Sequence, residues 1–88
     1  MESSYKVRLS DEGTKRFRKL DKRDADKIMK KLILLENFKK LNTIKQLSGE
    51  LKNLWRMRMG KIRVLFEVDE KTKTVWVVEA GFRKEVYR

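Results

Sequence analysis

The sequence contains no cysteine, no histidine and no proline, and only 4 glycines among its 88 residues. Without cysteine there are no disulfides, no thiolate nucleophiles and no cysteine-ligated metals. Without histidine the usual acid or base at neutral pH is missing, so any catalysis has to use arginine, lysine, tyrosine or carboxylates. Because proline and a Gly/Ser-rich linker are both absent, residues 1–88 are expected to form a single domain.

Long hydrophobic runs are also missing. The longest, residues 32–35, falls far short of the roughly 20 residues that a spanning helix needs. At the N-terminus no hydrophobic segment follows a basic one, so no signal peptide is expected. These two absences argue against a membrane partner and favour a cytoplasmic location.

Positive charge is what the sequence has in excess. The 24 Lys and Arg residues against 13 Asp and Glu give a formal net charge of +11. A charge this large on a short chain attracts polyanions over a long range. Nucleic acid is therefore the favoured partner, with an acidic protein as a further candidate.

Hydrophobic patterning predicts an α+β fold in the order β-α-α-β-β-β. Residues 5–9 alternate between apolar and charged, which indicates a short strand with one buried face. Ser10 or Asp11 can cap a first helix and Asp21 a second, whose apolar residues recur at helical spacing as far as Phe38. The two helices are expected to pack on one face of a small, mainly antiparallel sheet. After a loop over residues 42–53, the remaining strands are predicted at residues 55–59, 62–68 and 74–80.

The second half of the sequence predicts a β-hairpin with a definite register. Gly60-Lys61 fits a two-residue turn with glycine first, as a type II′ turn requires. The apolar residues of the two strands then face the helices, and three arginines share the other face. Such a group of guanidinium side chains matches phosphate oxygens, although an ordinary solvated basic surface is the alternative. The predicted pairs are Met59–Ile62, Arg58–Arg63, Met57–Val64, Arg56–Leu65 and Trp55–Phe66.

The hairpin segment, residues 54–66, resembles the signature of the RelE/ParE toxin superfamily. That signature has an aromatic residue, alternating basic and apolar residues, a glycine, and an arginine followed by three apolar residues. Residues 45–49 resemble the Lys-x-Leu-x-Gly loop that precedes it, and Arg83 and Tyr87 resemble the terminal pair of RelE. The resemblance implies a RelE-like fold and the toxin of a type II toxin–antitoxin pair. It also implies ribosome-dependent cleavage of mRNA in the A site, with no metal or cofactor, and a cognate RelB-like antitoxin as partner.

The resemblance also implies the residues of the site. Lys61 and Lys84 have no counterpart in the family pattern, but they lie close to the catalytic candidates in the sequence and are expected to bind RNA. Arginines suit stabilisation of the dianionic phosphorane that forms when a 2′-hydroxyl attacks the adjacent phosphate. The catalytic residues carried over by position are Arg56, Arg58, Arg63, Arg83 and Tyr87.

The general base is left open by a departure from the family pattern. Well-known members carry lysine where this chain has Arg56 and Arg58, and arginine is effectively always protonated. Tyr87, Glu85 or a ribosomal group would have to take the 2′ proton. Two other functions also stay open: a ParE-type inhibitor of DNA gyrase and a non-catalytic basic RNA-binding module.

Overall fold

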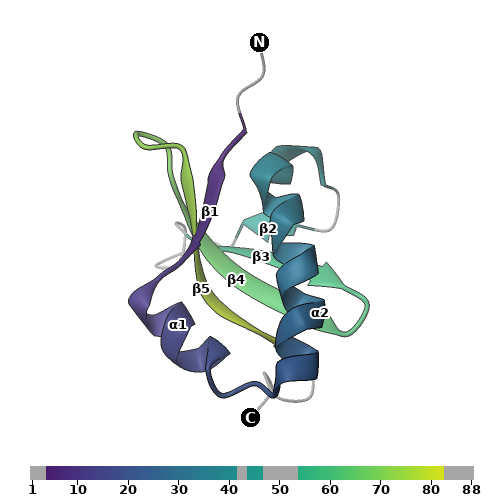
Figure 1. The fold of residues 1–88 in the computed structure, drawn as a ribbon. Helices are drawn as coiled ribbons and strands as arrows, with labels where there is room; N and C mark the ends of the chain where they lie inside the picture. Colours follow the sequence, from purple (N-terminus) through teal and green to yellow (C-terminus); the bar gives the residue numbers. More distant parts are fainter. Residues whose placement is uncertain (1–3, 42–43, 47–53, 83–88) are drawn as a thin grey trace.

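A five-stranded sheet with two helices on one face makes up the fold (Figure 1). The computed structural model describes residues 4–41, 44–46 and 54–82. The strand order is β1-β5-β4-β3-β2, with β1 parallel to β5 and the other neighbouring pairs antiparallel. The elements are β1 (Lys6–Leu9), α1 (Asp11–Phe17), α2 (Lys22–Leu32), the 3-10 helix η1 (Ile33–Lys40), β2 (Ile44–Gln46), β3 (Leu54–Met59), β4 (Ile62–Asp69) and β5 (Thr74–Phe82).

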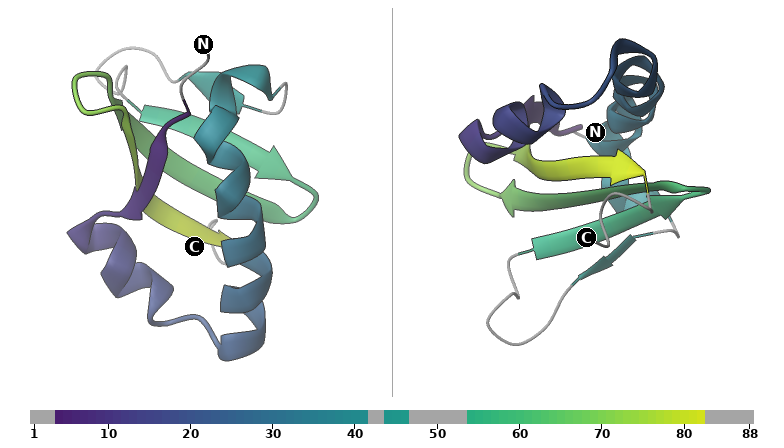
Figure 2. Two further views of the ribbon diagram at one scale, coloured as in Figure 1. Left: turned by 45° about the horizontal axis from the view of Figure 1, so that its top comes forward. Right: turned by 90° about the horizontal axis from the view of Figure 1, so that it is seen from below.

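Both helices begin at the predicted capping residues. The Ser10 hydroxyl accepts a hydrogen bond from the Gly13 amide (2.9 Å) and donates one to the Val77 carbonyl (3.1 Å), which ties the start of α1 to β5. The Asp21 carboxylate accepts from the Asp24 amide at the start of α2 (2.9 Å). Figure 2 (right) shows α1 and α2 on the same side of the sheet, so the predicted α+β arrangement is confirmed.

The second helix is shorter than predicted. It ends at Leu32, and η1 continues as a 3-10 helix with a non-helical residue at Asn37 (φ −128°, ψ 47°). The physical reason is the spacing of the buried residues: Leu32, Leu35 and Phe38 are three apart. In a 3-10 helix such residues lie in line along one face, whereas in an α-helix they would rotate away from the core.

One strand that the sequence did not predict lies within residues 42–53. Ile44–Gln46 forms β2 and pairs antiparallel with β3 at the edge of the sheet. Three residues are too few to show an alternating pattern, so only the pairing with β3 reveals this strand. Within the part of the chain that the structure describes, no helix is long and apolar enough to cross a membrane.

The core lies between the helices and the sheet and is partly aromatic. Trp55 and Phe66 stack with ring centroids 6.3 Å apart, as expected for a cross-strand pair. Phe38 of η1 meets both rings edge-on, at 5.3 and 5.6 Å. Aromatic contacts of this kind add to the burial of apolar area. They fix one end of the β3–β4 hairpin beneath η1, so the hairpin is a rigid support for the side chains on its other face.

Candidate nucleic-acid interface

The β3–β4 hairpin has the predicted register. All five predicted pairs, from Met59–Ile62 out to Trp55–Phe66, are present. Gly60 has φ +60°. Among the described non-glycine residues only Lys73 has a positive φ, so the φ of Lys61 is negative. Positive φ at the first turn position and negative φ at the second is the pattern of a type II′ turn. The turn therefore sets the register, and the register sets the positions of the arginines.

Arg56, Arg58 and Arg63 lie on the face of the sheet turned away from the helices; we call this the arginine face. Their sequence neighbours Met57 and Val64 are fully buried on the helix side. Because successive side chains of a strand point to opposite faces, the arginines must project from the other side. Arg58 is exposed, and Arg56 and Arg63 are partly buried. The strand register puts the three residues at neighbouring positions of this face.

A small pocket opens beside the hairpin turn. It measures about 100 Å³, and its lining includes Arg58, Lys61 and Arg63 together with Gly60 and Ile62. Apart from its two neighbours in the chain, no described residue has an atom within 4 Å of the place where a Cβ on Gly60 would stand. Three cationic side chains and an unobstructed turn make this the part of the arginine face best suited to one phosphate group. Lys61, expected to bind RNA, lines the same pocket.

Like charges face each other on the hairpin. Arg58 and Arg63 are directly opposite each other across the strands, an arrangement of like charges that destabilises a sheet. The ion pairs among the described residues join Arg16 to Glu12 and Glu79, and Glu70 to two lysines. None of them includes Arg56 or Arg58, so both guanidinium groups are available to an external anion.

One further cation belongs to this surface and was missed from the sequence as a site residue. Lys45 of β2 pairs with Arg56 of β3, which puts it on the arginine face next to that residue. Its place depends on β2, whose three residues carry no clear strand pattern. Its position in the Lys-x-Leu-x-Gly segment could have indicated that Lys45 belongs to the site, but that segment was interpreted as a loop.

The terminal part of the predicted site cannot be placed. Arg83, Lys84, Glu85 and Tyr87 lie outside the described residues. β5 ends at Phe82, which pairs with Ile62 beside the hairpin turn, and Gly81 pairs with Arg63. The chain therefore reaches the neighbourhood of the arginine face at the last described residue, immediately before Arg83.

A second ionisable cluster lies at the opposite end of β4. The Tyr5 hydroxyl donates a hydrogen bond to a Glu70 carboxylate oxygen (2.8 Å), and this bond is the main reason that the pKa of Glu70 is lowered. The pKa of Lys39 is raised, first by its interaction with the Tyr5 hydroxyl and then by the Glu70 carboxylate. Lys73 pairs with the same carboxylate at 3.4 Å. Because the carboxylate pairs with both lysines and with the Tyr5 hydroxyl, we assign the cluster a structural role.

Comparison with solved structures identifies the fold. A chain in the RelBE2 toxin–antitoxin complex of Mycobacterium tuberculosis superposes with a TM-score of 0.76 at 24% identity, covering 91% of this chain and 99% of that chain. The isolated RelE toxin of E. coli gives 0.69 at 22%, covering 96% and 92%. The archaeal RelE–RelB complex of Pyrococcus horikoshii gives 0.66 at 22%, covering 91% and 96%. No protein-family model matches the chain, and no curated protein does either.

This chain has the RelE-like fold, as the hairpin motif implied. The similarity extends over nearly the full length of both partners in each comparison. The class defined by the fold is therefore that of the RelE-like folds, here with the arginine face on the side of the sheet away from the helices.

Proposed function

We propose that the chain is the toxin of a type II toxin–antitoxin pair and acts as a ribosome-dependent endoribonuclease in the cytoplasm. The observation that carries the proposal is the arginine face, where Arg58 and Arg63 oppose each other beside a phosphate-sized pocket. The RelE-like fold supports it, because the similar structures include RelE toxins and their antitoxin complexes.

The proposed reaction is attack of a 2′-hydroxyl on the adjacent phosphate of mRNA, without a metal ion. Arg56, Arg58 and Arg63 stabilise the charge that builds up on the phosphorane oxygens, a role for which fixed cationic donors are effective. The P–O5′ bond breaks as the 2′ oxygen bonds to phosphorus; Arg83 stabilises the charge on the leaving 5′ oxygen, which takes a proton from water or a ribosomal group, and Tyr87 orients the nucleotide. Since arginine does not deprotonate, the 2′ proton goes to Tyr87, Glu85 or a ribosomal group. Positioning by the ribosome supplies part of the rate enhancement.

The direct test is to map mRNA 5′ ends on translating ribosomes with the wild-type chain and single variants. Arg58→Ala and Arg63→Ala are expected to lower the cleavage rate about a hundredfold or more, the usual cost of removing a transition-state donor. Arg23→Ala is the matched control, because Arg23 is an exposed arginine on α2, away from the arginine face. Undiminished cleavage by Arg63→Ala would remove the arginine face from the mechanism.

A second candidate function is inhibition of DNA gyrase. It is favoured by one similar structure, described as a YoeB/ParE toxin of Agrobacterium tumefaciens, with a TM-score of 0.67 at 17% identity. Intact message together with blocked supercoiling in the same extracts would support this candidate over mRNA cleavage. Binding of RNA with neither effect would instead indicate a non-catalytic RNA-binding module.

A further inference from the structure

The side of the sheet that carries the arginines also carries apolar side chains. Trp76 of β5 is partly exposed and lies between Val75 and Val77, which are fully buried on the helix side. Because side chains alternate along a strand, Trp76 projects from the other side, and so do Leu65 of β4 and Leu54 of β3. In the part of the chain that the structure describes, none of these three side chains belongs to the core or packs against it. We call Leu54, Leu65 and Trp76 the apolar patch.

The strand register joins the apolar patch to the arginine face. Leu65 is the direct cross-strand partner of Arg56. Glu67, two residues further along β4, pairs with Leu54 on one side and with Trp76 on the other. Direct and diagonal neighbours on one face of a sheet lie within reach of aromatic and long side chains. The patch therefore continues the arginine face in the direction away from the hairpin turn.

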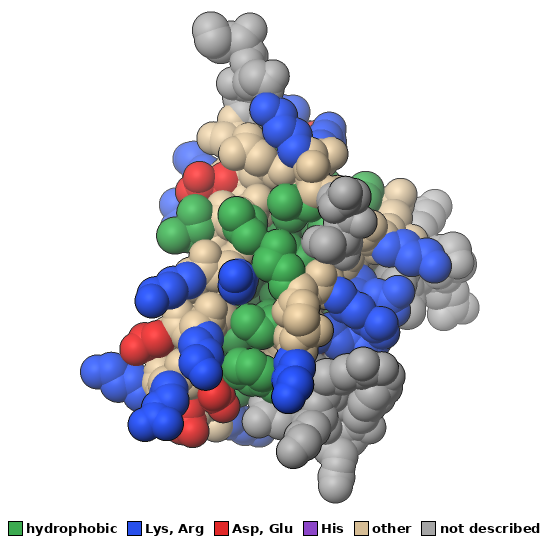
Figure 3. Space-filling view, turned by 90° about the vertical axis from the view of Figure 1, so that its right-hand side faces the viewer, with side chains coloured by type: hydrophobic (Ala, Val, Ile, Leu, Met, Phe, Trp, Pro, Cys, Tyr) green, Lys and Arg blue, Asp and Glu red, His purple; other side chains and the backbone are tan. Residues whose placement is uncertain are grey.

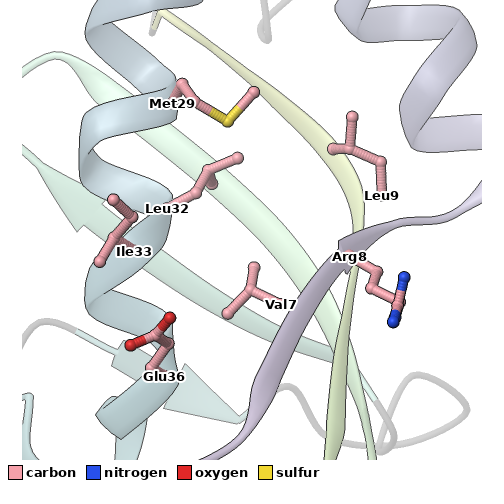
Figure 4. A pocket seen from close by; sticks show the side chains of 7 residues that line it. All are labelled: Val7, Arg8, Leu9, Met29, Leu32, Ile33 and Glu36. Atoms are coloured by element: carbon pink, nitrogen blue, oxygen red, sulfur yellow. The ribbon is translucent and has the colours of Figure 1, made fainter.

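A further cation borders the patch at the edge of the sheet. Arg8 of β1 is exposed and is the parallel partner of Trp76. In Figure 4, Val7 points from β1 toward α2, where it lines a small groove, whereas Arg8 points away from that groove. Arg8 thus lies on the same side of the sheet as the patch. The apolar patch has Arg56 beside it on β3 and Arg8 beside it on β1.

Apolar side chains among cations on an open sheet face fit a single strand of RNA. Each nucleotide offers a phosphate to the cations and a flat base, which stacks on an aromatic side chain. The net charge of +11 and the basic side chains spread over the flank seen in Figure 3 attract RNA without fixing its position. Both helices lie on the opposite side of the sheet (Figure 2, right), so neither of them covers the patch.

The phosphate pocket and the apolar patch are too far apart to be filled by the same nucleotide. Arg63 lines the pocket, and Glu67 is in the row of Trp76, roughly 13 Å further along β4 at about 3.4 Å per residue. Arg56, opposite Leu65, lies between the two. A strand with one phosphate in the pocket can therefore place its next phosphate near Arg56 and a neighbouring base over Trp76.

We propose that the apolar patch is a base-binding subsite for single-stranded RNA, in which the Trp76 indole stacks on a base of the strand whose phosphate occupies the pocket. Leu54 and Leu65 contact the edges of the same base. The Glu67 carboxylate repels phosphate and keeps the backbone of the strand on the arginine side. The inference rests on the proposed function for the identity of the ligand and adds a subsite to it.

The test compares binding of a short 2′-O-methyl RNA strand, which cannot be cut by attack of a 2′-hydroxyl, with binding of an abasic strand that has the same phosphates. Trp76→Ala is expected to bind the intact strand about tenfold more weakly and the abasic strand as wild type does. Its salt dependence should be unchanged, because no phosphate contact is lost. Trp76→Phe keeps an aromatic ring and should keep most of the affinity.

Two further measurements support the comparison. Leu34→Ala is the matched control, because Leu34 is an exposed apolar residue (39%) of η1, on the helix side of the molecule, and both strands should bind this variant as they bind wild type. Stacking quenches indole fluorescence, so the intact strand should quench the emission of wild type more than the abasic strand does. In Trp76→Phe, where Trp55 of the core is the remaining indole, this difference should disappear.

Two results would overturn the inference. Binding of the intact strand to Trp76→Ala as tightly as to wild type would mean that no base stacks on Trp76. Equal losses on the intact and abasic strands would show that Trp76 only supports the structure of the arginine face. Failure of the proposed function looks different: Arg58→Ala would bind both strands as wild type does, or ribosome-bound mRNA would stay uncut while the dependence on Trp76 remained.

Discussion

At the scale of single residues, Glu70 and the arginines of the hairpin differ in their ion-pair partners. Glu70 has a hydrogen bond and two ion pairs, from Tyr5, Lys39 and Lys73, whereas Arg56 and Arg58 have no ion-pair partner among the described residues. Other arginines, such as Arg8 and Arg23, also have no ion pair among the described residues, so Arg56 and Arg58 are distinguished by their place with Arg63 on one face of the hairpin.

The Tyr5–Glu70 bond makes stability depend on pH in a predictable direction. Because the folded state lowers the pKa of Glu70, its contribution is present above the ordinary pKa of a glutamate and is lost as the pH falls through the lowered value. Tyr5→Phe should lower the melting temperature by a few degrees at neutral pH and by less in acid. Thermal unfolding of both chains over a pH series checks this. A difference that stays constant down to the lowest pH would contradict the assigned role of the carboxylate.

At the scale of elements, the hairpin was predictable from the sequence and two other features were not. Gly60 and the alternation on either side of it specify the turn, the register and the arginine face together. The change from α2 to η1 was missed because apolar residues three apart also occur in α-helices, and only packing decides between the two. β2 was missed because Ile44–Gln46 is too short to show an alternating pattern. Lys45 was therefore not recognised as part of the arginine face.

The junction of α1 with β5 gives a prediction for a single element. A Cβ at Gly13 would collide with the Val77 carbonyl oxygen, to which the capping Ser10 hydroxyl also donates. Gly13→Ala should therefore destabilise the chain by about 1–3 kcal/mol through overpacking, despite the better helix propensity of alanine. Denaturant unfolding measures this, with Lys15→Ala on the exposed side of α1 as control. Equal stability of the Gly13 variant and wild type would show that α1 can shift without cost.

At the scale of the whole molecule, the two faces of the sheet have different tasks. The helix face holds the core and, beside β1, an open apolar groove. The other face carries the cations. The arginine face could be predicted from the sequence, because it depends on alternation along a single hairpin. The groove could not, because it joins β1 to α2 through tertiary packing and leaves no sequence pattern. The net charge of +11 predicted a polyanionic partner but not the surface that would bind it.

The central claim is that the chain keeps like charges opposite each other on the hairpin because a phosphate binds there, at a cost to folding. Arg58→Glu tests it most directly, since it replaces a repulsive cross-strand pair with an attractive one at an exposed position. Stability and cleavage of ribosome-bound mRNA should be measured on the same preparation. We expect the free energy of unfolding to rise by about 0.2–1 kcal/mol while cleavage falls a hundredfold or more. A variant that is less stable than wild type and still cleaves normally would contradict the account.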